Sequence, residues 1–183
     1  LWASFKTKSA FAKYSKVRVA TGLTGAQAAQ RMLDSAGIRD VKVVPHQGML
    51  TDHYNPVTKT LALSEQVYGV PSVAAVGVAC HEAGHAIQHA TAYKPLWLRS
   101  LLVPTANLGS TLGYLVMTFG LILGSMKMCL VGVVLFACGL AFQLSTLPVE
   151  FDASSRAKQL AVANGIVLPQ EREGIDRVLN AAA

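Results

Sequence analysis

The chain of 183 residues is long enough for one domain with a hydrophobic core. Only 14% of its residues are charged and 52% are hydrophobic, whereas an ordinary soluble domain is about 25% charged. This composition indicates a membrane protein. The net charge of +6 raises nucleic acid as a partner, but the sequence has no basic patch interleaved with aromatic residues. We therefore expect no nucleic-acid partner.

The N-terminal part combines a basic segment with a helix. Residues 5–18, FKTKSAFAKYSKVR, include five basic groups and no acid. This pattern is typical of a solvated helix or of a juxtamembrane stretch on the cytoplasmic side, and the apolar segments further along favour the second. A helix is expected over 24–37, because Thr24 and Gln27 have the spacing of a capping box and Gly37 ends the pattern.

Short strands follow, and then a longer helix. VKVV at 41–44 predicts one strand, and the extended runs on either side of Asn55 and Pro56 predict a hairpin. Ser64 is expected to cap a short helical turn. Pro71 at a first helical position predicts a long helix over about 71–93. The expected fold class is α+β and mostly helical, with a small sheet.

Two apolar stretches then dominate the chain. No charged residue lies between Arg99 and Lys127, and none lies between Lys127 and Glu150. Each stretch is long enough to cross about 30 Å of hydrocarbon, which takes about 20 helical residues. The pattern predicts a transmembrane helical hairpin over 100–149. The alternative is a buried helical pair in a soluble core.

The segment VACHEAGHAIQHA, residues 78–90, contains an HExxH motif formed by His81, Glu82 and His85. On a helix, two imidazoles four residues apart can bind one Zn²⁺, with the intervening glutamate beside the attacking water. Zinc activates this water and polarises the scissile carbonyl, while Glu82 takes the proton as general base and delivers it to the leaving amine. The motif predicts zinc-dependent peptide hydrolysis.

His89 is a poor third ligand. In an unbroken helix it lies about 12 Å along the axis from His81, which zinc–nitrogen bonds of about 2 Å cannot span. No glycine between His85 and His89 would turn the chain. We expect His89 either to support the ligands through a hydrogen bond or to be merely structural.

The third ligand is expected on the same side of the membrane as the histidine helix. Glu150 meets this condition, because a hairpin of two spans returns the chain to the face that it left. The alternative is that Glu150 is an acid favoured at a helix start. Asp152 is the next candidate ligand, or it supports the ligands without contacting the metal. The alternative for Asp152 is an ion pair with Arg156 four residues later. The small Gly84 would let the helix that carries Glu150 approach closely.

Four blocks in order, LTDHYNP, HEAGHAIQHA, LRSLLVPTANLGS and LPVEFDASSRA, resemble the YugP-like bacterial membrane zinc metallopeptidases. These are related to the HtpX heat-shock proteases and the CAAX proteases. The resemblance covers nearly the whole chain and implies a zincin-like core, with His81, His85 and Glu150 as zinc ligands and Glu82 as catalytic base. The wider relatives carry Glu-x-x-x-Asp, and this chain has Ser154 at the Asp position. The family also implies a membrane helix upstream of Leu1.

The hairpin before the histidine helix is a candidate substrate site. In zinc peptidases of this general fold, an edge strand there binds the substrate backbone as an added strand. His53 and Tyr54 would then donate hydrogen bonds to the oxyanion. The alternative is that both residues belong to ordinary turn chemistry around Asn55 and Pro56.

These expectations divide the chain into three parts. Residues 1–99 form the N-terminal part of the zinc peptidase core, 100–149 the transmembrane hairpin, and 150–183 the helical C-terminal part that carries the third ligand. The hairpin loop has only Lys127, so the positive-inside bias places the active site at the cytoplasmic face of the bacterial plasma membrane.

The predicted function is that of a multi-pass, membrane-embedded zinc endopeptidase. It would cleave peptide or membrane-protein substrates in membrane-associated proteolysis or quality control. The alternative is a membrane scaffold or adaptor with a structural zinc site, for which Glu82 would have no use. Gly109 and Gly113 have a helix-packing spacing, so a membrane-protein partner or a homo-oligomer stays open.

Overall fold

The computed structural model of the protein describes residues 2–182, apart from the side chains of residues 2–4, 97–105, 145 and 182. The chain forms two compact units. Unit 1 comprises Leu1–Ala92 and Glu150–Ala183, and unit 2 comprises Tyr93–Val149. The helix α6 begins in unit 2 and ends in unit 1.

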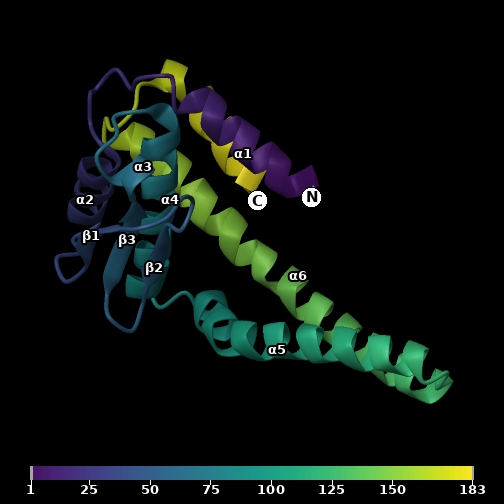
Figure 1. Ribbon diagram of the computed structural model, residues 1–183. Helices are drawn as coiled ribbons and strands as arrows, with labels where there is room; N and C mark the ends of the chain where they lie inside the picture. Colours follow the sequence, from purple (N-terminus) through teal and green to yellow (C-terminus); the bar gives the residue numbers. More distant parts are fainter. Residues whose placement is uncertain (1, 183) are drawn as a thin grey trace. The chain divides into compact units, whose positions relative to one another are not determined.

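The described part of the chain is mostly helical and has one small sheet, as the sequence predicts (Figure 1). The helices are α1 (Trp2–Tyr14), α2 (Gly25–Ser35), α3 (Glu65–Tyr68), α4 (Val73–Ala90), α5 (Lys94–Ile122), α6 (Met126–Ala163), the 3₁₀ turn η1 (Pro169–Glu171) and α7 (Arg172–Ala182). The strands are β1 (Lys42–His46), β2 (His53–Asn55) and β3 (Thr60–Ser64).

The sheet has the order β1-β3-β2, with β3 parallel to β1 and antiparallel to β2. The predicted hairpin is confirmed. Its turn is held by Asn55, whose Oδ1 accepts hydrogen bonds from the backbone N–H groups of Val57 (2.9 Å) and Thr58 (3.2 Å). The central strand β3 is the most buried of the three. Among the described strands, β2 pairs on one side only and is therefore an edge strand.

The start of α2 follows the predicted capping box. The N–H of Gln27 donates to Thr24 Oγ1 (3.3 Å), and the N–H of Thr24 donates to Gln27 Oε1 (3.0 Å). Gly37 lies just beyond the helix at φ +73°, a conformation that glycine adopts without steric cost. Both ends of this helix were thus visible in the sequence.

The histidine helix α4 (Val73–Ala90) is shorter than expected. The predicted range of 71–93 is wrong at both ends. Ser72 is the N-cap, because its Oγ accepts the N–H of Ala75 (3.2 Å), so Pro71 lies outside the helix. The helix ends at Ala90, and Ala92 adopts a left-handed φ of +51°. A serine side chain that bonds the first turn sets the start more strongly than a proline before it.

Helix α4 runs through the hydrophobic core of unit 1. Its apolar side chains Val76, Ala79, Cys80 and Ala83 are fully buried, and α2 and α7 pack against it. Helices α1 and α7 lie side by side (Figure 1), and Thr7 Oγ1 donates to the carbonyl of Ala181 at 2.6 Å. Residues on α4 are therefore held by packing on several sides.

Unit 2 pairs α5 with the first part of α6 through glycines. A Cβ at Gly113 would lie 2.5 Å from Phe136 N, and a Cβ at Gly132 would lie 2.5 Å from Met117 N. Gly113 is thus used for packing within the chain. By length and composition, α6 is the one described helix that qualifies as a membrane span, while the apolar segment Ala106–Ile122 of α5 is shorter.

Candidate metal centre

Three side chains of unit 1 converge with their donor atoms all within 4.8 Å of one another: His81 and His85 from α4, and Glu150 from α6. His81 Nε2 lies 3.2 Å and His85 Nε2 lies 3.4 Å from Glu150 Oε2. Tetrahedral ligands bonded to zinc at about 2 Å are roughly 3.3 Å apart. These three residues, the candidate ligand group, therefore fit a zinc ion.

The close approach of α4 and α6 depends on Gly84. A Cβ at this position would lie 2.8 Å from the carbonyl oxygen of Ala153, so only glycine fits without displacement. The interpretation of Gly84 as the point where the helix carrying Glu150 packs is confirmed. Gly84 lies one residue before His85, and Ala153 lies three residues after Glu150, so the two helices approach most closely beside the candidate ligand group.

The candidate ligand group is partly screened from solvent. His85 is 6% exposed, and His81 and Glu150 are half-buried. Burial by itself lowers the pKa of His85, but the hydrogen bond to Glu150 and the charges of Glu82 and Glu150 raise that pKa above its ordinary value. A metal ion that binds here therefore competes with a proton for His85.

Both histidines turn Nε2 toward Glu150 and Nδ1 toward another side chain. His81 Nδ1 lies 3.1 Å from Ser154 Oγ, and His85 Nδ1 lies 2.9 Å from Gln88 Oε1. Ser154, at the position where the wider relatives carry aspartate, thus contacts a member of the candidate ligand group. Each imidazole is held in place at its far nitrogen, as is usual for metal-binding histidines.

Glu82, the candidate base, lies on α4 between the two histidines and is half-buried. Its charge is one of the causes that raise the pKa of His85, so the carboxylate is close enough to interact electrostatically with the candidate ligand group.

His89 and Tyr54 contact each other. Tyr54 Oη lies 2.8 Å from His89 Nδ1, which brings the edge strand β2 against the last turn of α4. Burial raises the pKa of Tyr54, with the charge of Asp40 as a smaller cause, so the phenol stays protonated at neutral pH and can donate a hydrogen bond. His89 is exposed and lies outside the candidate ligand group.

His53, the neighbour of Tyr54 on β2, has other contacts. Its Nδ1 lies 2.8 Å from the carbonyl oxygen of Thr51, and its ring centroid lies 5.4 Å from that of His46 in an edge-on arrangement. The structure thus brings Tyr54 to the histidine helix, whereas His53 contacts Thr51 in the loop before β2 and His46 at the end of β1.

Asp152 is held by two donors. Arg156 Nε donates to its Oδ2 at 2.6 Å, and Gln88 Nε2 donates to the same oxygen at 2.7 Å. The predicted ion pair with Arg156 is therefore present, and among the described residues Asp152 is not part of the candidate ligand group. The sequence analysis did not identify Gln88. A polar residue three positions after His85 on an otherwise apolar helix face could have indicated a hydrogen-bond partner for that histidine.

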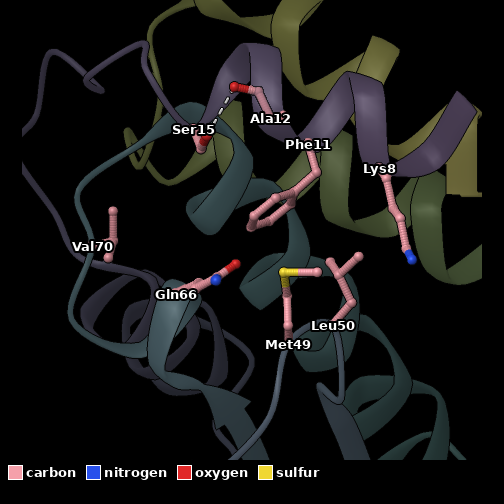
Figure 2. Close-up of a pocket in the computed structure, with 8 residues that line it drawn as sticks. All are labelled: Lys8, Phe11, Ala12, Ser15, Met49, Leu50, Gln66 and Val70. Carbon is pink, nitrogen blue, oxygen red and sulfur yellow. Dashed lines mark hydrogen bonds between the residues drawn. The ribbon is translucent and has the colours of Figure 1, made fainter. Parts of the chain in front are cut away.

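An open apolar cavity of about 480 Å³ lies elsewhere in unit 1. Phe11 from α1 and Met49 and Leu50 from the loop before β2 converge on it, with Lys8 nearby (Figure 2). None of the candidate ligand group lines this cavity. It is therefore not the site at which the histidines would act.

Two histidines on one helix and a carboxylate on another form a donor set that suits zinc. The chain matches, over residues 1–183, the family described as "Putative neutral zinc metallopeptidase", and it belongs to that family. It is similar to "Putative membrane protease YugP" of Bacillus subtilis (strain 168), with 48% identity over 182 residues that cover 100% of this chain and 81% of that relative. No solved structure matches the chain.

These comparisons confirm the family resemblance drawn from the four sequence blocks. Zinc is the metal of the family, and the candidate ligand group has the donors and the spacing to bind it. Membrane association has support from the name of the relative and from the apolar helix α6.

Proposed function

We propose that the protein is a membrane-embedded zinc endopeptidase with a zincin-like core, in which α4 is the HExxH helix. The observation that carries the proposal is the convergence of His81, His85 and Glu150, with Glu82 between the two histidines. A structural zinc site would need no such glutamate. In this proposal His81, His85 and Glu150 hold the ion and Glu82 is the catalytic base.

The proton transfers belong to Glu82. Zinc, when bound, polarises the scissile carbonyl and makes water more acidic. The carboxylate of Glu82 accepts a proton from the attacking water and then delivers it to the amine that leaves as the C–N bond breaks. Glu82 thus ends each cycle ionised, and no further co-reactant is needed.

Substrate binding is proposed at the edge strand β2. An extended peptide that adds to this edge would gain main-chain hydrogen bonds and would run beside the last turn of α4, where Tyr54 contacts His89. The protonated phenol of Tyr54 would donate to the oxyanion. Tyr54 is better placed for this role than His53, whose contacts are with Thr51 and His46.

Residues 100–149 are proposed to form a transmembrane hairpin, with 1–99 and 150–183 as the peptidase core. Large apolar side chains at the α5–α6 turn are more than 60% exposed, as expected for contact with lipid: Leu121, Ile122, Leu123 and Met126. Since Lys127 is the one charge of the loop, the positive-inside bias supports a core at the cytoplasmic face. A membrane-impermeant reagent should label a cysteine placed at this loop in intact cells. Labelling of a cysteine in the core instead would show that the orientation in the membrane is the opposite one.

The test of the activity compares wild type with Glu82→Gln in detergent, using zinc-loaded protein and an unfolded test protein as substrate. Glu82→Gln should keep zinc and lose cleavage, whereas Glu65→Gln, at an exposed acid on α3, should retain both. Equal cleavage by wild type and Glu82→Gln would refute the role of Glu82. Zinc bound firmly by an inactive wild type would favour the scaffold.

A further inference from the structure

A continuous chain of polar contacts leads from the surface of α6 to His85. Arg156 Nε donates to Asp152 Oδ2 (2.6 Å), Gln88 Nε2 donates to the same oxygen (2.7 Å), and Gln88 Oε1 lies 2.9 Å from His85 Nδ1. Gln88 is completely buried, while Asp152 and Arg156 are half-buried. The buried side-chain amide of Gln88 thus connects the ion pair of Asp152 and Arg156 to His85.

The donors and acceptors in this series of contacts permit only one orientation of the Gln88 amide. An ionised carboxylate only accepts hydrogen bonds, so Asp152 requires the NH₂ group of the Gln88 amide to face it. The amide oxygen then faces His85, and this oxygen only accepts. His85 Nδ1 must therefore carry a hydrogen. The other neutral tautomer would set two acceptors against each other at 2.9 Å.

We propose that Gln88 is a positioning residue that keeps the hydrogen of His85 on Nδ1 and so directs the Nε2 lone pair toward zinc. Asp152, itself fixed by Arg156, sets the orientation of the Gln88 amide. The charged pair thereby acts on the metal centre without contacting the metal. This inference rests on the proposed zinc site.

The other histidine is held differently. Ser154 Oγ, 3.1 Å from His81 Nδ1, both donates and accepts, because a hydroxyl rotates to suit its neighbour. A serine therefore leaves the tautomer of His81 undetermined, whereas Gln88 determines that of His85. His85 is also the more buried of the two. Of the two histidines, His85 is therefore the one whose ring and tautomer are set before the metal binds.

A merely structural role for Gln88 makes a different prediction. Removal of a buried hydrogen-bonding side chain lowers the free energy of unfolding in either case. Only the positioning role also changes the tautomer of one imidazole and the affinity for metal. These two properties, measured on folded protein, therefore separate the two roles.

The first measurement uses metal-free full-length protein with ¹⁵N-labelled histidine, at an alkaline pH where the imidazoles are neutral. The proteins compared all carry Glu150→Leu, because Glu150 Oε2 lies 3.4 Å from His85 Nε2 and would otherwise hold a hydrogen there. With Gln88 present, His85 should show the Nδ1–H form, assigned by loss of its signals in His85→Ala. Gln88→Leu, which is similar in size and has no polar atoms, should give a mixture of tautomers. The Nε2–H form of His85 in the presence of Gln88 would overturn the proposal.

The second measurement is zinc affinity by competition with a chelator, together with the visible spectrum of the cobalt-substituted protein. Gln88→Leu should bind zinc about 10–100-fold more weakly, the usual effect of losing a partner of a metal-binding histidine, and should alter the cobalt spectrum. Gln159→Leu, at an exposed glutamine of α6, is the matched control and should change neither.

Asp152→Leu covers the case in which Gln88→Leu does not fold. This change removes the carboxylate oxygen that accepts from both Arg156 and Gln88 and so lets the amide of Gln88 take either orientation. His85 should then lose its single tautomer, and zinc should bind more weakly. An affinity and cobalt spectrum equal to wild type in the folded variants would refute the positioning role while leaving the zinc site intact. Failure of wild type to bind zinc would instead refute the proposed function, and this inference with it.

Discussion

Gly84 on α4 packs directly against the backbone carbonyl of Ala153 on α6, at a distance where a Cβ would lie 2.8 Å from the oxygen. The two helices that carry His85 and Glu150 therefore meet at a point where no other residue fits. Carbonyl groups of a helix cannot rotate away, so an added methyl group has to move one of the helices.

We expect Gly84→Ala to weaken zinc binding by about tenfold or more. Alanine favours the helix by about 1 kcal/mol, but overpacking of this kind costs about 1–3 kcal/mol and separates the ligands. Gly77→Ala is the matched control on the same helix, because its Cβ would make an ordinary contact of 3.6 Å with Ile175. Gly77→Ala should retain zinc affinity and raise the melting temperature. Unchanged zinc affinity in Gly84→Ala would show that the contact does not set the site.

Tyr54→Phe should lower kcat about 10²-fold, the usual effect of losing an oxyanion donor, and should leave zinc affinity unchanged. The substitution keeps the ring and removes the hydroxyl that reaches His89. His53→Ala is the comparison at the neighbouring position, and its effect should be smaller. Steady-state kinetics on a peptide substrate would check both variants. Full activity in Tyr54→Phe would show that the hydroxyl of Tyr54 takes no part in the reaction.

The sequence predicted the elements of unit 1 well because local signals agree with tertiary packing there. The capping box at Thr24 and the turn at Asn55 are both present in the structure, since each depends on residues only a few positions apart. The sequence also predicted that Glu150 would lie beside the two histidines, and the structure brings the three residues together. That prediction started from an even number of membrane crossings between them, which stays a prediction.

Gln88 shows what the sequence did not disclose. Its role depends on Asp152, which lies 64 residues further along the chain, and no local pattern links the two. The start of α4 was misplaced for a different reason, because Pro71 and Ser72 are both acceptable near a helix start and the hydrogen bond of Ser72 decides between them.

Cys80 should remain unreactive in the folded protein. Burial raises the pKa of its thiol to about 12, and the thiolate is the reactive form. Since the unfolded chain loses this proton near pH 9 and the folded chain does not, stability should fall as the pH rises from about 9 toward 12. Cys80→Ala should remove this part of the decline, measured as the difference in unfolding free energy between the two proteins. Rapid alkylation of folded protein at Cys80, in a background without Cys129 and Cys138, would contradict the prediction.

Gly113 and Gly109 have the spacing of a helix-packing motif but different surroundings in unit 2. A Cβ at Gly113 would lie 2.5 Å from Phe136 N, whereas a Cβ at Gly109 would have its nearest neighbour, Leu135 O, at 3.9 Å. We therefore expect Gly113→Ala to force α5 and α6 apart and to lower the melting temperature in detergent. Gly109→Ala should be tolerated or slightly stabilising. The opposite ranking, or a loss of oligomers in Gly109→Ala alone, would mean that the motif packs against a second protein rather than within the hairpin.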